Sequence, residues 1–293
     1  LTGRHPKDFD LATDATPNKV KKMLPMYPTI ESGEQFAVVN VVTDDDTYEI
    51  ATFREDIGKG RRPDEVKFST IDKDVLRRDL TINALFYDLD TSEIVDLVGG
   101  ISDLENGIIK TVGRAEDRFD EDKLRIMRAL RFAGRIGTDV NEDIDNAIKK
   151  DNSTISGDGK PLAQERIQDE FVKGIKQAKS SKQFVEMVKK YGLFDWVFHD
   201  MDTSGEIVDS KSPLVVIASL LRNETGDIDK KLTGRLKFNK LQGKQIKFLI
   251  EFFRDGTPDT AYNFKNRIKS LGIDGSILHG FGKVMGMDKS FIK

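Results

Sequence analysis

Two aspartates near the start of the chain have a spacing that suits metal chemistry. Asp8 and Asp10 alternate with Phe9 and Leu11, so an extended segment would place both carboxylates on one face and both apolar side chains in a core. Adjacent carboxylates repel each other unless a cation neutralises them, and Mg²⁺ prefers oxygen ligands. The pair therefore predicts a Mg²⁺ site, although an exposed surface loop would explain an isolated Asp-x-Asp equally well.

Glu49 is a candidate third carboxylate. It alternates with Tyr48 and Ile50, which predicts a strand with one charge on an otherwise apolar face. An unpaired acid would be costly if it were buried there. The alternative is that Glu49 lies on an edge strand and faces water.

Arg77 and Arg78 stand directly before Asp79 and an apolar run. One guanidinium could bind a triphosphate while Asp79 orients it or caps a helix. The same residues would also fit an ordinary helix start with a salt bridge.

The segment 121–132 carries acids and arginines at helical spacing. On one helix, Asp122 and Arg125 would be i,i+3 neighbours about 5–6 Å apart, and Arg128 and Arg131 would continue the spacing. A carboxylate can accept from the exocyclic amine of cytosine or adenine while a guanidinium donates to the neighbouring ring nitrogen. Guanine and uracil present the reverse polarity, so such a pair could select C and A by about 1–3 kcal/mol. A salt-bridged exposed helix is the commoner outcome of this spacing.

Composition excludes several other kinds of site. The chain has no cysteine, and its three histidines lie far apart at positions 5, 199 and 279, so disulfides, thiol nucleophiles and Cys-ligated metals are excluded. The longest apolar run, 213–221, is about half of the ~20 residues that cross a bilayer, and no secretory leader opens the chain. We therefore expect a cytoplasmic protein whose metal ions rest on carboxylates.

Charge is distributed unevenly along the chain. Residues 230–293 carry a net charge of +9, and residues 1–229 carry −12. A basic end on an acidic chain suits a polyanionic partner such as a nucleic acid. A Lys-rich, solvated helical surface is an equal alternative.

The pattern of elements changes near residue 114. Before it, strand signals occur at 36–42 and 48–53, and a hairpin is predicted across 86–96. After it, Leu124, Met127 and Leu130 recur at helical spacing up to the glycines at 134 and 137. Further helices are predicted at 161–171, 183–191, 213–221, 242–253 and 261–271. The predicted class is α+β, a small mixed-sheet head followed by an all-helical part.

Four segments in order identify a resemblance. They read Arg-x-Pro-Lys-Asp-x-Asp-x-Ala-Thr, then Thr-Phe-Arg with Gly-Arg-Arg-Pro, then Arg-Arg-Asp-Leu-Thr-Ile-Asn-Ala-Leu, then Glu-Asp-x-x-Arg-x-x-Arg-x-x-Arg-Phe. The combination resembles class II tRNA nucleotidyltransferases, the CCA-adding enzymes, and their bacterial poly(A) polymerase relatives, over roughly residues 1–171. It implies addition of CCA to the 3′ end of tRNA from CTP and ATP, with pyrophosphate release by a two-metal mechanism using Mg²⁺.

The resemblance also implies roles for single residues. Asp8 and Asp10 match the metal-binding acids of the family, and Glu49 matches its third catalytic carboxylate. Arg78 matches a nucleotide-contacting arginine. The segment 54–66 is similar to a flexible loop associated with the change from C to A, although a plain hairpin turn is equally permitted.

In the second half of the resemblance, Asp122 and Arg125 match the amino-acid template for CTP and ATP. Arg128 and Arg131 match accompanying nucleotide-site arginines. Glu165 and Arg166, in Leu-Ala-Gln-Glu-Arg-Ile, resemble a neck segment that braces the template helix, and Gln164 stands where the family often has a small residue.

The implied organisation is a catalytic head at 1–113, a neck with the nucleotide-selecting helix at 114–178, and a body and basic tail for tRNA at 179–293. Members of the family carry a Gly-Gly-x-Val-Arg-Asp segment before the first aspartate, and this segment is absent from the sequence, which starts at Leu1. Either the sequence is truncated, or a first strand and its phosphate contacts are missing. The alternatives are a poly(A) polymerase, an enzyme that adds only CC or only A, or a catalytically silent RNA-binding relative.

Overall fold

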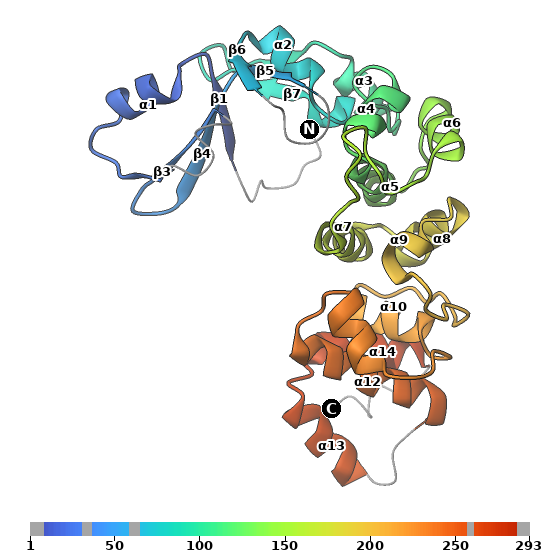
Figure 1. Cartoon of the computed structure of the whole chain (residues 1–293). Helices are drawn as coiled ribbons and strands as arrows, with labels where there is room; N and C mark the ends of the chain where they lie inside the picture. The colour runs from blue at the N-terminus through green and yellow to red at the C-terminus, as the bar shows by residue number, and fades with distance from the viewer. Residues whose placement is uncertain (1–8, 31–36, 59–64, 257–260, 286–293) are drawn as a thin grey trace. The chain divides into compact units, whose positions relative to one another are not determined.

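The computed structural model describes residues 9–30, 37–58, 65–256 and 261–285 of the chain (Figure 1). The chain divides into two compact units. One comprises Leu1–Ile101 with Thr111–Arg114, and the other comprises Ser102–Lys110 with Ala115–Lys293. The strands lie in the first unit and most of the helices in the second, so the predicted α+β class is confirmed.

A mixed sheet organises the first unit (Figure 1). Its strands are β1 (Asp10–Thr13), β2 (Thr29–Ile30), β3 (Val38–Val42) and β4 (Thr47–Thr52), in the order β1-β4-β3-β2. The β1 strand runs parallel to β4, whereas β3 is antiparallel to both β4 and β2. Val39 and Val41 pack with Val20 of α1 (Pro17–Met23) in a small core on one face of the sheet. The strands predicted at 36–42 and 48–53 are thus confirmed.

Two hairpins complete the first unit. The strands β5 (Arg54–Ile57) and β6 (Glu65–Phe68) form one, and β7 (Leu85–Tyr87) and β8 (Ile94–Asp96) form the other. The helix α2 (Ile71–Leu76) and the 3₁₀ turn Thr81–Asn83 connect them. The hairpin predicted across 86–96 is confirmed.

Helices build the second unit. They are α3 (Gly100–Glu105, shared with the first unit), α4 (Ala115–Glu121), α5 (Leu124–Ile136), α6 (Glu142–Lys150), α7 (Gln164–Gln177), α8 (Ser181–Lys190), α9 (Phe194–Phe198), α10 (Pro213–Leu220), α11 (Ile228–Lys230), a π-helical turn (Lys231–Arg235), α12 (Lys240–Asp255), α13 (Ala261–Ser270) and α14 (Gly275–Val284). The α5 helix ends at Ile136 and is capped by Gly137, whose φ of +75° is left-handed. Of the two glycines predicted to end this helix, Gly137 is at its end and Gly134 lies inside it.

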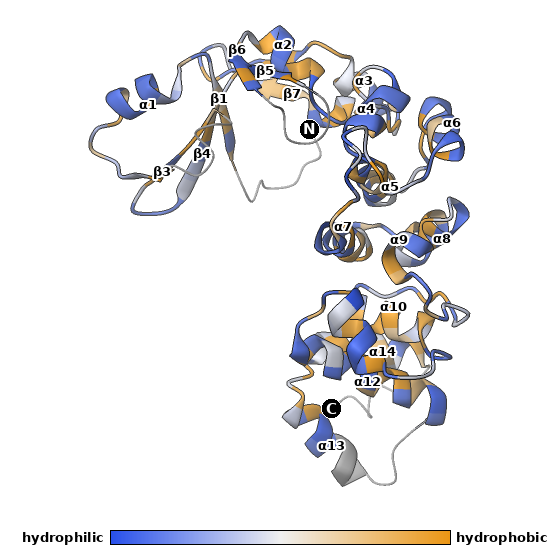
Figure 2. Cartoon of the chain, viewed as in Figure 1, coloured by the Kyte–Doolittle hydropathy of each residue, from blue (hydrophilic) through white to orange (hydrophobic). Residues whose placement is uncertain are grey.

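The core of the second unit has two centres. In one, α5, α7 and α8 meet at Phe184, which lies against Gly134 and Gly174. In the other, every residue of α10 is buried, because this helix is apolar all round and packs against α7, α12 and α14 (Figure 2). In the described part of the chain, no helix is long and apolar enough to cross a membrane.

Candidate active site

Sheet pairing brings two of the predicted carboxylates together. Asp10 and Glu49 are direct partners on the parallel strands β1 and β4, and Asn40 of β3 is the next partner of Glu49. Both acidic side chains are exposed. Since β4 is an inner strand, Glu49 does not lie on an edge strand, but it is exposed, as that alternative also predicted.

The prediction that Phe9 lies in the core is wrong. Phe9 is 60% exposed, because pairing with β4 starts at Asp10 and the sheet does not cover the residue before it. Leu11 is half-buried, as expected for an inward position.

The pair of carboxylates fits a divalent cation. Neighbouring strands lie about 4.8 Å apart, so the carboxylates of Asp10 and Glu49 can reach one ion between them. Asp8 lies outside the described residues. Within those residues, no group of three or more metal-ligating side chains occurs. The donor set of the pair is oxygen only, which is the kind that hard cations prefer.

Arg78 is held by a buried acid in the first unit. Its guanidinium binds Asp74 at 3.2 Å, donates to the Asn83 carbonyl at 3.3 Å and stacks over the Phe86 ring at 4.3 Å. Arg77 also binds Asp74, at 2.8 Å. Both arginines follow α2, and a 3₁₀ turn starts at Thr81. The salt bridge of the alternative reading is therefore present, but its acid belongs to the helix that precedes the arginines.

Asp79 makes hydrogen bonds at the start of the 3₁₀ turn after these arginines. Its carboxylate accepts from the Leu80 backbone N–H at 2.8 Å and from the Asn83 side chain at 3.3 Å. The N-cap of this 3₁₀ turn is Leu80, which makes no side-chain cap bond, so the helix-capping role predicted for Asp79 is not confirmed.

Positive charge gathers around Asp74. The carboxylate, only 2% exposed, accepts from the Arg54 backbone N–H at 3.2 Å as well as from Arg77 and Arg78. Burial lowers the pKa of the Arg54 guanidinium, and the charge of Arg77 lowers it further. Asp74 thus holds two guanidinium groups, whereas that of Arg54 pairs with Asp56 at 2.9 Å. Three arginines against two acids leave a local excess of positive charge suited to a polyphosphate.

Aromatic packing connects this cluster to the carboxylate strand. Phe86, which carries Arg78 on its face, packs edge to face against Phe53 with ring centroids 5.8 Å apart. Phe53 directly follows β4, the strand that carries Glu49. The fold therefore places the arginines beyond the carboxyl end of that strand.

Asp122 lies in a bend of the second unit. The α4 helix ends at Glu121 and α5 begins at Leu124, so the prediction of one continuous helix through Asp122 and Arg125 is wrong. The Asp122 carboxylate accepts from the Leu124 backbone N–H at 3.1 Å, which caps α5 and favours the break. The residue is 8% exposed.

The ion pair that orients Asp122 comes from α7. Arg166 donates to the two carboxylate oxygens of Asp122 at 2.7 and 3.4 Å. Arg125 instead binds Glu121 at 2.5 Å and the Arg118 carbonyl at 3.3 Å. The i,i+3 spacing brings Asp122 and Arg125 into the same region, but each has another ionic partner.

The remaining arginines of α5 differ in exposure. Arg128 is half-buried and reaches the Glu170 carboxylate of α7 at 3.6 Å. Arg131 is buried, donates to Glu170 at 2.6 Å and to Gln177 at 3.0 Å, and stacks on Phe132. Their predicted contact with a nucleotide stays a prediction, and the visible role of Arg131 is to join α5 to α7.

Sequence reasoning missed Asp74 and Glu170. Asp74 precedes Arg77 and Arg78 by three and four residues, and this helical spacing was a readable signal. Glu170 lies 39 residues from Arg131, and no local pattern joins them. Gln164, a departure from the family pattern, donates to the Trp196 carbonyl at 3.1 Å and so ties α7 to α9.

Comparisons with known proteins identify relatives of this chain. Residues 1–110 match the model of the poly A polymerase head domain family. The CCA-adding enzyme of Lactobacillus helveticus is 34% identical over 276 residues, which are 88% of this chain and 67% of that protein. The CCA-adding enzyme of Ligilactobacillus salivarius is 41% identical over 96% of this chain and 72% of its own length, and that of Bacillus subtilis is 35% identical over 83% and 62%.

Solved structures share the fold. The Bacillus stearothermophilus CCA-adding enzyme in complex with CTP aligns with a TM-score of 0.66 at 22% identity, covering 98% of this chain and 80% of that chain. A tRNA nucleotidyltransferase complexed with a primer tRNA and an incoming ATP analog aligns with a TM-score of 0.70 at 17% identity, covering 99% and 89%. The chain spans about two thirds of the length of the curated relatives above.

Proposed function

This chain belongs to the family of CCA-adding enzymes, and we propose that it adds C, C and A to the 3′ end of tRNA from CTP and ATP without a nucleic-acid template, releasing pyrophosphate. The observation that carries the proposal is the register of Asp10 with Glu49 on adjacent parallel strands, beside an arginine cluster at the end of the second strand. Acids next to cations fit a triphosphate whose metal ions also hold the attacking hydroxyl.

In the head, the acids would bind metal and an arginine would bind the nucleotide. Membership of the family implies a divalent metal. Asp8, Asp10 and Glu49 would hold Mg²⁺, which when bound supplies charge neutralisation and a lowered pKa for the RNA 3′-hydroxyl. Arg78 would contact the nucleotide, because the ring of Phe86 and the carboxylate of Asp74 keep its guanidinium in one orientation. A preorganised cation costs little reorganisation when charge develops on the leaving pyrophosphate.

The template residues would read the base edge. One carboxylate oxygen of Asp122, Oδ2, accepts a hydrogen bond from Arg166 at 2.7 Å and no other bond within the described residues. This oxygen can therefore accept a second hydrogen bond, from the amine of cytosine or adenine. Arg125 would break its hydrogen bond to Glu121 and donate instead to the adjacent ring nitrogen of the base. Arg128 and Arg131 would assist, as the family resemblance implies.

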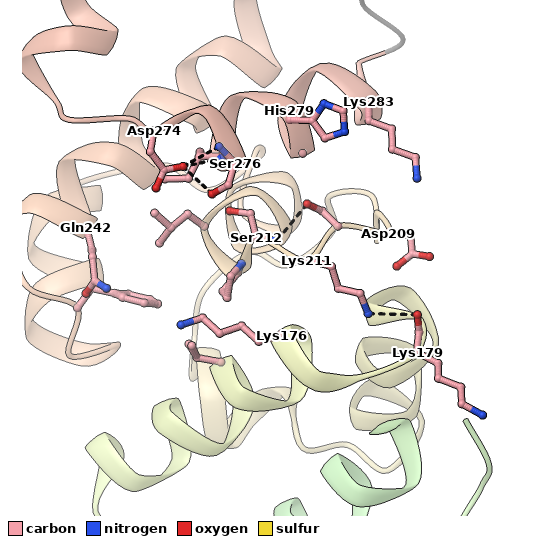
Figure 3. Close-up of a pocket in the computed structure, with 17 residues that line it drawn as sticks. Lys176, Lys179, Asp209, Lys211, Ser212, Gln242, Asp274, Ser276, His279 and Lys283 are labelled. Carbon is pink, nitrogen blue, oxygen red and sulfur yellow. Dashed lines mark hydrogen bonds between the residues drawn. The ribbon is translucent and has the colours of Figure 1, made fainter. Parts of the chain in front are cut away.

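A basic groove supports binding of the RNA backbone to the helical part. It encloses about 690 Å³ and is lined by residues of α7, α12 and α14 and of the segment before α10 (Figure 3). The groove carries Lys176, Lys179, Lys211 and Lys283. Within the described residues, Lys211 is the one of these four whose ammonium group makes a hydrogen bond or ion pair, to the carbonyls of residues 178 and 179.

The acids of this groove are already engaged. Asp209 accepts from the backbone and hydroxyl of Ser181 at 2.9 Å, and Asp274 caps α14 by accepting from Ser276 and Ile277. Their charges are directed at these donors, whereas Lys176 and Lys283 project from opposite walls (Figure 3). Hydrogen bonds from neutral donors leave both aspartates charged, so four lysines against two aspartates give the groove a net positive charge that suits a phosphate backbone.

The assay for the whole proposal uses tRNA that lacks its CCA end, Mg²⁺ and one nucleotide at a time. When CTP is supplied first and ATP second, both should be incorporated in that order. Addition should stop after three nucleotides. Incorporation of GTP or UTP as readily as CTP would refute selection by Asp122 and Arg125. An unbounded A tail would identify a poly(A) polymerase, which the similarity to CCA-adding enzymes does not favour.

The groove has its own test. Lys176→Gln with Lys283→Gln should weaken tRNA binding and lower the salt dependence of log K by about 0.7–0.9 for each phosphate that the variant no longer neutralises. Lys173→Gln is the matched control, because Lys173 lies on the same α7 but already pairs with Asp169 at 2.7 Å. Equal effects of the control and the groove variants would contradict the assignment.

The division into a head at 1–113, a neck at 114–178 and a body and tail at 179–293 stays a proposal, as do the cytoplasmic location and the role of 54–66 in the change from C to A. The antiparallel pairing of β5 with β6 supports a hairpin in that segment, with Gly58 at a φ of +112°. Residues 59–64 lie outside the described part of the chain.

A further inference from the structure

A loop from a distant part of the sequence contacts the bend that carries Asp122. The loop, residues 151–157, follows α6 and meets the chain between α4 and α5. Its hydrogen bonds to the bend involve residues on both sides of Asp122.

On one side of Asp122, the loop holds Lys123. The side chain of Lys123 is only 4% exposed, and its ammonium group pairs with the Asp151 carboxylate. The Lys123 backbone N–H donates to the Ser156 hydroxyl at 3.1 Å. Both the main chain and the side chain of this residue are therefore fixed by the loop.

On the other side, the loop holds Asp120. The Gly157 backbone N–H donates to the Asp120 carbonyl at 2.6 Å. A Cβ on Gly157 would lie 2.5 Å from the Asp120 carboxylate, which would have to move, and 3.1 Å from the Asp120 carbonyl, so glycine favours this close approach. The two anchored positions, 120 and 123, bracket Asp122.

The burial of Lys123 is informative because an ammonium group is expensive to remove from water. An apolar residue of similar size would stabilise a packed site as well or better, and a buried ion pair is thus weak evidence for stability alone. The Asp151 side chain is 51% exposed, so the pair draws the loop over the bend and leaves its outer end in solvent. The ion pair of Lys123 with Asp151 thus fixes the loop against the bend, although the two residues lie 28 positions apart in the sequence.

We propose that Asp151 and Ser156 are positioning residues for nucleotide selection: together with Gly157 they clamp positions 120 and 123 and so set the place of the Asp122 backbone. Arg166 then sets the direction of the Asp122 carboxylate. This inference rests on the proposed function, because it assigns the loop to the residue that would read the base. A shift of the bend would misalign the acceptor against the amine of CTP and reduce discrimination against UTP.

The experiment compares Asp151→Asn, Ser156→Ala and Asp122→Asn in the full chain, on tRNA lacking its CCA end. The quantity measured is kcat/KM for CTP divided by kcat/KM for UTP. We expect the ratio to fall by about fivefold or more in Asp151→Asn and in Ser156→Ala, as weakening one half of a bidentate pair with the base would cause. The KM for CTP should rise more than kcat falls, since the loop affects placement of the base.

Asp169→Asn is the matched control. It breaks the exposed pair of Asp169 with Lys173 on α7 and should leave the ratio unchanged. Because Asp151 is half exposed, Asp151→Asn removes the charge without opening a cavity, so its folding can be checked by thermal unfolding and circular dichroism.

The outcomes separate the loop from the proposed function. A ratio within about twofold of wild type in both loop variants, while Asp122→Asn has lost its preference, overturns the clamp and leaves the proposed function standing. An unchanged ratio in Asp122→Asn itself refutes base selection by that residue, and the clamp is overturned with it. A fall in ratio in the loop variants and in Asp122→Asn, but not in Asp169→Asn, establishes the clamp.

Discussion

Replacing Arg131 by Met tests whether this arginine of α5 is a structural brace or a nucleotide ligand. Arg131 and its partner Glu170 have side chains only 8% and 6% exposed. Removing one partner of a buried ion pair costs about 3–5 kcal/mol, because the other charge is left buried without compensation. Arg128 lies 3.6 Å from the same carboxylate and retains part of the attraction. We therefore expect a loss of about 2–4 kcal/mol in the free energy of unfolding.

Arg125 on the same helix provides the comparison. Its partner Glu121 is four residues away, and the two side chains are 19% and 35% exposed. Ion pairs near the surface contribute about 0.2–1 kcal/mol. Arg125→Met should thus lose far less stability than Arg131→Met, although both remove one positive charge from the same helix.

The assay is urea unfolding of the full chain followed by far-ultraviolet circular dichroism, with the KM for CTP measured in parallel. Arg131→Met should shift the urea midpoint downward with a small change in KM. Adding Glu170→Leu should recover much of the loss, since both charges are then absent. Wild-type stability of Arg131→Met together with a raised KM would refute the brace and favour the nucleotide role.

Four further predictions concern the site and the core. Asp10→Ala should abolish nucleotide transfer while the Kd for tRNA stays unchanged, and a parallel loss of binding would contradict its role in metal binding. Arg125→Ala should lower the preference for CTP over UTP by about fivefold or more, measured by single-nucleotide incorporation. Gly174→Ala should destabilise the chain by about 1–3 kcal/mol in urea unfolding, despite the helix propensity of alanine, because its Cβ would lie within 2.7 Å of three ring atoms of Phe184. The hydrogen bond from Lys123 lowers the pKa of Asp151 from 3.8 to about 2. The ionised Asp151 should therefore stabilise the fold above pH 3.8, and this stabilisation should disappear as the pH falls through 2. Asp151→Asn should lack this part of the acid unfolding transition.

Local pattern was sufficient for most elements. The period of two around Glu49 predicted β4, and the recurrence of Leu124, Met127 and Leu130 predicted α5, because each periodicity places apolar side chains on one face. The glycine at 137 marked the end of α5, since a left-handed cap favours that residue. The pairing of Asp10 with Glu49 was not readable, because strand order and register depend on contacts between distant segments.

The sequence by itself determined which residue types were present at helical and strand spacing, and therefore the family, the fold class and the candidate acids and arginines. Only the tertiary structure decided the partners of those side chains. Arg166 reaches Asp122 across 44 residues and Glu170 reaches Arg131 across 39, and the carboxylate of Asp122 also breaks the helix that spacing alone would have continued. Periodicity reports the face on which a residue lies, whereas the identity of its ionic partner depends on which other element packs against that face.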